Sequence, residues 1–180
     1  MTYKELYRKT KNTFLQAGIE SPAFDASCLL EHCFGIGRQG LIMNGSQTAP
    51  AGGIPRFQLL CERRAKGEPL QYLLGSWDFM GRQFFVGPGV LIPREDTQAT
   101  VLRALELLSP VPRPRIADLC AGSGAIAVTL AKERPQSDVT ALELSDKAFG
   151  YLKKNIRHNN APNVRAVKGD VFRDFHKFER

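Results

Sequence analysis

The sequence predicts an α/β protein with three parts: an N-terminal helical bundle (residues 1–75), a β-hairpin linker (76–92) and the first half of a parallel doubly wound domain (93–180). Apolar residues recur at helical spacing in the first part, and aromatic residues alternate with glycines in the second. In the third part, strand and helix patterns alternate, which is typical of a parallel sheet with right-handed crossovers.

Helical periodicity and chain-breaking residues divide the first part. A helix is predicted over Tyr3–Ala17. Ser21-Pro22 has the pattern of an N-cap followed by proline at the first helical position, and Gly35 ends this second helix. Residues 45–53 are rich in Ser, Thr, Pro and Gly, so they form a loop, and a further helix is predicted over Pro55–Lys66. We expect these helices to pack as a compact bundle.

The second part, Trp77–Leu91, combines aromatic residues with closely spaced glycines. Aromatic residues favour strands, and glycine permits tight turns between them. We therefore expect a short hairpin that connects the two domains.

The third part follows a regular order of helices and strands. The first helix, Thr97–Leu108, is expected to bury Val101, Leu102, Leu105 and Leu108. After it, strands are predicted over Arg115–Leu119, Asp138–Leu142 and Val164–Val167, and helices over the residues up to Glu133 and over Asp146–Asn159. This βαβαβ order predicts a Rossmann-like domain.

A glycine-containing turn, Asp118–Gly124, joins the first predicted strand to the following helix. Its glycines allow the backbone to approach a ligand closely, and the start of the helix presents N–H groups. Glu143 ends the second strand, where a carboxylate can accept both hydroxyl hydrogens of a ribose. Asp170 ends the third strand and can accept a hydrogen bond from an adenine amine. Three successive strand ends therefore predict a pocket for an adenosine-containing cofactor.

The loop alone leaves the cofactor open. Gly122, Gly124 and Ala127 also satisfy the dinucleotide pattern, so a nicotinamide cofactor and S-adenosyl-L-methionine are both compatible with it. Asp118 favours the latter, because it suits the ammonium group of the methionine part. The preceding helix points the same way, since the first Rossmann strand of a dehydrogenase normally opens its domain. A third possibility is that the glycines serve only a tight turn.

Several ordered motifs resemble the release factor glutamine N5-methyltransferase family. They are Arg63-Arg64 with Gly67–Gly75, Phe79–Gly81 with Phe85–Arg94, Asp118–Ala127, and Ala141–Ser145 with Ala148. The resemblance implies a helical domain that helps to hold the release factor, a hairpin linker and a methyltransferase domain. It implies methyl transfer from S-adenosyl-L-methionine to the side-chain amide nitrogen of glutamine in the Gly-Gly-Gln motif of peptide chain release factors, a modification linked to translation termination.

The resemblance also assigns site residues. The predicted cofactor-binding set is Asp118, Cys120, Ala121, Gly122, Ser123, Gly124, Glu143, Asp170 and Val171. Glu143 replaces the more common aspartate, and Val171 stands where an aromatic residue can cover the adenine. The family's Pro-Arg-Pro-Glu-Thr-Glu is here Pro93–Gln98. In this segment Arg94, Asp96 and Thr97 are substrate candidates, and the alternative is that Asp96 or Thr97 caps the next helix.

The family's Asn-Pro-Pro-Tyr motif is absent from the sequence, so no catalytic residue is predicted. We expect a deliberate truncation, a proteolysed or partly recorded chain, or a fragmentary gene product, with little or no activity alone. The alternative functions are another amide or adenine N-methyltransferase and a non-catalytic partner-binding module.

Composition excludes other classes. The net charge of +7 is scattered rather than concentrated, so no direct nucleic-acid partner is expected. The four cysteines lack the C-x-x-C spacing of a metal site. No apolar run is long enough to span a membrane, and no leader precedes the first helix, so we expect a cytoplasmic location.

Overall fold

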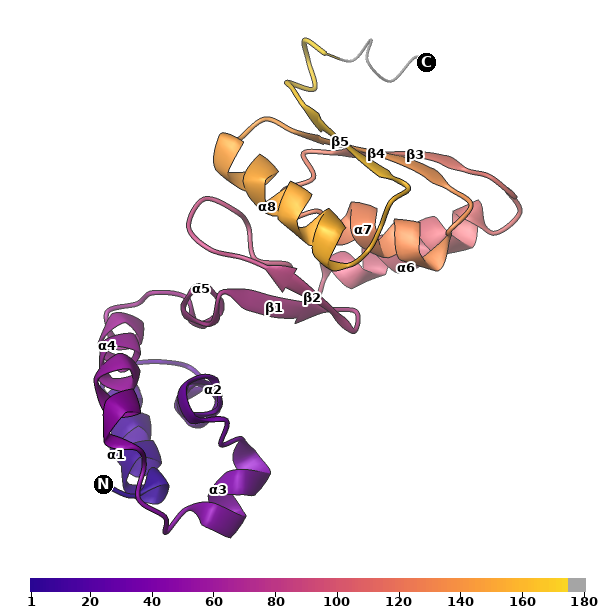
Figure 1. Ribbon diagram of the computed structural model, residues 1–180. Helices are drawn as coiled ribbons and strands as arrows, with labels where there is room; N and C mark the ends of the chain where they lie inside the picture. The colour runs from indigo at the N-terminus through magenta and orange to yellow at the C-terminus, as the bar shows by residue number, and fades with distance from the viewer. Residues whose placement is uncertain (175–180) are drawn as a thin grey trace. The chain divides into compact units, whose positions relative to one another are not determined.

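The computed structural model describes residues 1–174 and divides the chain into two compact units, Met1–Leu74 and Gly75–Arg180 (Figure 1). The last residues of the predicted domain 93–180 lie outside the described part. Within that part, no helix is both long and apolar enough to cross a membrane.

The first unit is helical throughout. Its elements are α1 (Tyr3–Gln16), α2 (Pro22–Phe34), α3 (Arg38–Asn44), the 3-10 helix η1 (Ala51–Gly53), α4 (Ile54–Ala65) and α5 (Leu70–Leu74). A capping box opens α1: Glu5 N–H donates to Thr2 Oγ1 at 3.2 Å, and Thr2 N–H donates to the Glu5 carboxylate at 2.8 Å. Ser21 occupies the predicted N-cap of α2, but its side chain makes no capping hydrogen bond.

Apolar packing of α1, α2 and α4 forms the core of this unit. Phe14, Leu29 and Leu30 are fully buried, and Phe57 of α4 is almost so. The sequence did not predict α3 or α5. The first of them spans seven residues and exposes Ile42 and Met43, so it has no apolar face at helical spacing. The second has only five residues, too few to show a period.

The second unit begins with an antiparallel hairpin, β1 (Ser76–Phe79) and β2 (Arg82–Phe85). Both turn residues between the strands, Met80 and Gly81, have positive φ angles, 52° and 73°. Positive φ at both central positions is the mark of a type I′ turn, whose twist suits a two-residue hairpin. The predicted hairpin is therefore present, and its strands end at Phe85.

The rest of this unit is a parallel sheet covered by helices. Its elements are α6 (Thr97–Leu108), β3 (Arg115–Leu119), α7 (Ala125–Glu133), β4 (Asp138–Glu143), α8 (Asp146–His158) and β5 (Val164–Lys168). The strand order is β3-β4-β5, with both pairs parallel, as the βαβαβ pattern predicted. In Figure 1, α6, α7 and α8 lie on the same side of this sheet.

The core of the second unit lies between the sheet and these helices. Val101, Val128, Val139 and Leu152 are all fully buried there. The prediction for one residue of α6 is wrong: Leu102 is 52% exposed. Val101 is buried and the predicted core residues Leu105 and Leu108, at i+4 and i+7, are only partly buried; Leu102 lies one position off this stripe.

Candidate functional site

The carboxyl ends of β3, β4 and β5 meet at one edge of the parallel sheet (Figure 1). Ala121 N–H donates to Leu142 O at 2.8 Å, so the turn after β3 is attached to the end of β4. Gly169 N–H donates to Glu143 O at 3.2 Å, which attaches the segment after β5 to the same place. Glu143 therefore lies between the other two strand ends, as a pocket shared by all three requires.

The turn after β3 depends on residues with left-handed backbone geometry. Cys120, Gly122 and Gly124 have φ angles of 64°, 57° and 82°. A Cβ on Gly124 would lie only 2.6 Å from Leu152 Cδ1, so glycine is needed there both for its φ angle and for close packing against α8. The loop therefore has little freedom to change its path.

Glu143 is a buried carboxylate whose two oxygens bind backbone on both sides. Gly122 N–H donates to Oε2 at 2.8 Å, and Ser145 N–H donates to Oε1 at 2.7 Å. Only 8% of the residue is exposed, and within residues 1–174 no lysine or arginine pairs with it. Each oxygen keeps a further lone pair for a ligand.

Asp118 is the second buried carboxylate, and it also lacks a cationic partner among the described residues. Its Oδ2 accepts a hydrogen bond from Ala127 N–H at 3.0 Å. Burial raises the pKa of Asp118 from 3.8 to about 6; the Ala127 hydrogen bond opposes this rise, and the nearby Glu143 charge adds to it. The ends of β3 and β4 therefore concentrate negative charge that no lysine or arginine within residues 1–174 neutralises.

The N–H groups of the glycine turn are largely used inside the protein. Besides the bonds from Ala121 and Gly122, Gly124 N–H donates to Ala121 O at 2.8 Å, and Ala127 N–H is held by Asp118. Phosphate sites on such turns require free N–H groups. These four donors are not free.

Asp170 lies after β5 in a compact turn. Its Oδ1 accepts from Phe172 N–H at 2.9 Å, and its own N–H donates to Asp174 Oδ2 at 2.8 Å. Arg173 Nε lies 3.9 Å from Oδ2. Val171 is half-buried, and the aromatic residue next to it, Phe172, is 94% exposed. Asp170 thus lies at the predicted edge, with part of its acceptor capacity used locally.

The substrate candidates Arg94, Asp96 and Thr97 lie just before and at the start of α6. Arg94 Nε is 3.6 Å from Asp96 Oδ1, and both side chains are well exposed. Asp96 occupies the N-cap position of α6, but no side chain makes a capping hydrogen bond there. Among residues 1–174, no hydrogen bond or ion pair connects these three side chains with the strand ends.

One buried polar residue was missed by sequence reasoning. Asn155 of α8 is fully buried and binds the backbone of Phe85 and of Ser123, in the glycine turn. Asn155 lies on the same helical face as the apolar residues Ala148 and Leu152. This polar residue on an otherwise apolar face could have indicated a buried hydrogen-bonding role.

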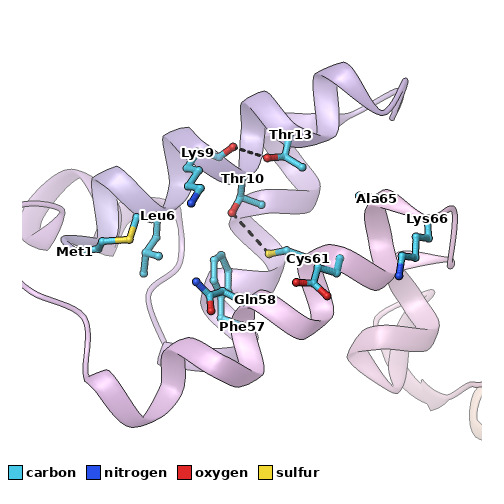
Figure 2. A pocket seen from close by; sticks show the side chains of 11 residues that line it. Met1, Leu6, Lys9, Thr10, Thr13, Phe57, Gln58, Cys61, Ala65 and Lys66 are labelled. Carbon is cyan, nitrogen blue, oxygen red and sulfur yellow. Dashed lines mark hydrogen bonds between the residues drawn. The ribbon is translucent and has the colours of Figure 1, made fainter.

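A separate pocket lies in the helical unit, between α1 and α4 (Figure 2). It has a volume of about 440 Å³ and is lined by Met1, Leu6, Lys9, Thr10, Thr13, Phe57, Gln58, Cys61, Glu62, Ala65 and Lys66. Burial raises the pKa of Cys61 to about 11, so this thiol remains protonated at neutral pH. No group of three or more metal-ligating side chains occurs in the described part of the chain.

Comparison with known protein families matches residues 87–179 to the methyltransferase small domain. The match covers more than half of the chain, so the chain belongs to this family of methyltransferase domains. Residues 5–75 match a second family, the PrmC N-terminal domain.

Curated relatives named release factor glutamine methyltransferase confirm the resemblance predicted from the motifs. The relative from Burkholderia pseudomallei is 42% identical over 75% of this chain and 47% of its own length. The relative from Bifidobacterium longum is 35% identical over 87% of this chain and 55% of its own length. The relative from Escherichia coli is 38% identical over 88% of this chain and 56% of its own length. This chain spans about half the length of the curated relatives it matches.

Among solved structures, M. jannaschii TYW2 in complex with AdoMet aligns with 54% of this chain and 44% of its own, at 22% identity and a TM-score of 0.46. So weak a likeness adds nothing to the family match.

Proposed function

We propose that this chain binds S-adenosyl-L-methionine at the carboxyl edge of β3–β5, as part of an enzyme that methylates release factors. The methylated atom is the side-chain amide nitrogen of glutamine in their Gly-Gly-Gln motif. The observation that carries the proposal is the pair of buried carboxylates, Asp118 and Glu143, that no lysine or arginine neutralises in the described structure.

The charge of the site suits a cationic cofactor. S-adenosyl-L-methionine carries a positive sulfonium group and a positive ammonium group, and opposite charges attract strongly where water is excluded. In the proposed arrangement Asp118 faces the ammonium, and Glu143 accepts the two ribose hydroxyls through its remaining lone pairs. Asp170 accepts from the adenine amine beside Val171, while Cys120, Ala121 and Ser123 supply the backbone wall of the loop.

The same features disfavour a nicotinamide dinucleotide. Its pyrophosphate would need N–H donors on the glycine turn and at the start of α7, and three donors of the turn and that of Ala127 already have partners. Two carboxylates beside the turn would also repel the phosphates. We therefore choose the methyl donor over the dinucleotide that the glycine pattern alone left open.

When bound, the cofactor supplies an electrophilic methyl group on sulfur. An amide nitrogen attacks it poorly because its lone pair is delocalised, so orientation of the amide is the main task of the enzyme. In the family that task belongs to the Asn-Pro-Pro-Tyr motif, which residues 1–180 do not contain. The proposal therefore gives these residues the binding of the cofactor, with exposed Arg94, Asp96 and Thr97 as contacts for the substrate.

The helical unit is proposed to hold the release factor, in the cytoplasm where translation terminates. The match of residues 5–75 and the names of the relatives support this role. The pocket between α1 and α4 offers one contact surface, since Lys9 and Lys66 flank its apolar floor.

Titration calorimetry with S-adenosyl-L-homocysteine, S-adenosyl-L-methionine and NAD tests the cofactor. We expect binding of the first two and none of NAD. Glu143→Ala should weaken the binding by about 2 kcal/mol, roughly thirtyfold, because it removes a charge-assisted acceptor. The control is Glu106→Ala, which removes an exposed carboxylate paired with Arg103 on α6 and should change nothing. Tight NAD binding, or an unchanged affinity in Glu143→Ala, would contradict the proposal.

Transfer of a radiolabelled methyl group to a purified release factor tests the substrate. The control is the same release factor with its Gly-Gly-Gln glutamine replaced by alanine. Labelling of both proteins would place the methylated atom elsewhere and refute the proposed substrate. Because residues 1–180 lack the Asn-Pro-Pro-Tyr motif, we expect this chain to bind the cofactor with little or no labelling. Robust labelling of the intact release factor alone would support the substrate and show that the motif is not required.

A further inference from the structure

The segment that leaves the hairpin runs along α8 in matched register. Moving four residues back along the helix corresponds to moving two residues forward along the extended chain. The pairs are Asn159 with Gln83, Asn155 with Phe85, Tyr151 with Gly87, and Lys147 with Gly89. Four helical residues rise about 6 Å and two extended residues about 6.6 Å, so the two spacings agree from Gln83 to Gly87. Beyond this point the chain turns, with Val90 N–H donating to Gly87 O at 3.2 Å, and Gly89 lies against Lys147 within that turn.

The two glycines show how closely this segment approaches the helix. A Cβ on Gly87 would collide with the Tyr151 hydroxyl, and one on Gly89 would lie 2.6 Å from Lys147 Cδ. Phe85 is held from the side as well: the Lys154 ammonium lies 3.5 Å from its ring centroid. The hairpin exit is therefore fixed to α8 at several points.

Asn155 is the fully buried residue among these α8 contacts, and its amide group has three partners. Its Oδ1 accepts from Phe85 N–H at 2.7 Å. Its Nδ2 donates to Phe85 O at 3.0 Å and to Ser123 O at 2.8 Å, which uses both amide hydrogens. A buried amide would be costly without these bonds. No other residue of similar size supplies one acceptor and two donors.

The third partner of the Asn155 amide, the Ser123 carbonyl, connects α8 with the glycine turn. Ser123 lies between Gly122, which Glu143 holds from β4, and Gly124, which packs against Leu152 of α8. The turn is thus held from two sides, by a carboxylate of the sheet and by an amide of the helix. We propose that Asn155 is a positioning residue that fixes the cofactor loop and couples it to the hairpin segment leading toward Arg94.

This inference rests on the proposed function, since the loop is taken to hold S-adenosyl-L-methionine. A loop held in one conformation before the ligand arrives binds with a smaller loss of conformational entropy. A loop released from Asn155 must be ordered at the moment of binding. Loss of the Asn155 hydrogen bonds should therefore lower the order of the loop and the affinity for the ligand, as well as the stability of the fold.

Asn155→Leu tests this role, because leucine fills the same space without hydrogen bonds. We expect amide hydrogen exchange at Gly122 and Gly124, followed by NMR in the unliganded protein, to rise about tenfold. We expect the Kd for S-adenosyl-L-homocysteine to rise by a similar factor, about tenfold.

Asn163→Leu is the matched control. The Asn163 amide also donates to backbone oxygens, of Ala131 and Ser137, but at the amino-end edge of the sheet, opposite the strand ends that form the candidate site. It should lower the melting temperature without changing loop exchange or affinity. If Asn155→Leu alters both no more than Asn163→Leu does, Asn155 is only structural and the inference is wrong.

Asn155→Asp is a second variant that tests the contacts with Phe85 and Ser123 separately. A carboxylate keeps the acceptor for Phe85 N–H, but it places an oxygen against the carbonyls of Phe85 and Ser123, to which the amide donated. The Phe85 amide should stay protected while exchange in the glycine turn rises; an unchanged turn would refute the coupling. The exchange readout needs no cofactor, so failure of the wild-type protein to bind S-adenosyl-L-homocysteine would contradict the proposed function while the role of Asn155 is still decided.

Discussion

Asp25 in the helical unit and Asp118 in the sheet unit are both buried aspartates, but their surroundings differ. Arg64 Nε donates to Asp25 Oδ2 at 2.7 Å, and the same guanidinium donates to Glu68 O at 3.0 Å. Asp118 has only a backbone N–H, and Glu143 beside it has two. One unit thus neutralises its buried carboxylate internally, and the other leaves two of them without a counter-ion among residues 1–174.

The difference indicates what each carboxylate is for. A buried ion pair with additional hydrogen bonds is a closed structural unit, since neither charge needs a further partner. Carboxylates held only by N–H groups keep their charge available, and they are costly to the folded state unless a cation arrives. This contrast, more than the glycine pattern, separates the candidate ligand site from the structural core.

The largest effect is expected from breaking the pair in the helical unit. Arg64→Ala leaves Asp25 buried without its cation, so we expect a loss of about 3 kcal/mol in the free energy of unfolding, measured with urea. Its neighbour provides the control, because Arg63 forms an exposed pair with Glu68 and Arg63→Ala should change stability little. Equal losses of stability in the two variants would show that the buried Arg64–Asp25 pair contributes no more than the exposed Arg63–Glu68 pair.

A second prediction concerns the pH dependence of the sheet unit. The folded state binds a proton at Asp118 more tightly than the unfolded state does, because the pKa is raised from 3.8 to about 6. Stability should therefore fall as pH rises between these values, by about 3 kcal/mol from this group. Asp118→Asn keeps the acceptor for Ala127 N–H and should lack this loss.

Urea unfolding of both proteins at several pH values between 4 and 7 measures the difference. The wild type should lose stability relative to Asp118→Asn up to about pH 6 and then remain parallel to it. Parallel curves over the whole range would show that Asp118 does not bear an unpaired buried charge.

The smallest expected effect is a difference in the rate at which thiols of the two units react with iodoacetamide. Burial raises the pKa of both Cys28 and Cys61 to about 11, whereas Cys120 lies exposed in the glycine turn. Brief iodoacetamide treatment at pH 8, followed by peptide mass mapping, should label Cys120 first. S-adenosyl-L-homocysteine should slow that labelling and leave the others unchanged. Preferential labelling of Cys61 would mean that the helical unit opens more readily than its packing suggests.

The sequence predicted those features that depend on neighbouring residues in the chain. The glycine turn, the ends of β3 and β4 and the position of Glu143 follow from short apolar runs that stop at polar residues. The roles of Asp118 and Glu143 as backbone acceptors did not follow from the sequence, because their partners are set by the path of the folded turn.

Features that depend on contacts distant in sequence were missed. Asn155 is seventy residues from Phe85, and only the folded structure brings them together. Leu102 was assigned to the core because its apolar character fits the helix, but Val101 and Leu105 set the direction that α6 presents to α7. The helix α3 has seven residues and buries none of them, so its sequence is too short and too evenly exposed to carry a periodic signal.

The matched register between α8 and residues 83–87 restricts where this chain can be cut or lengthened. A fragment that began at residue 93 would expose the flank of α8 and leave the Asn155 amide facing water, whereas one that began at Gly75 would keep the covering strand. A single-residue insertion before Gly87 would bring a side chain against Tyr151, where only glycine fits.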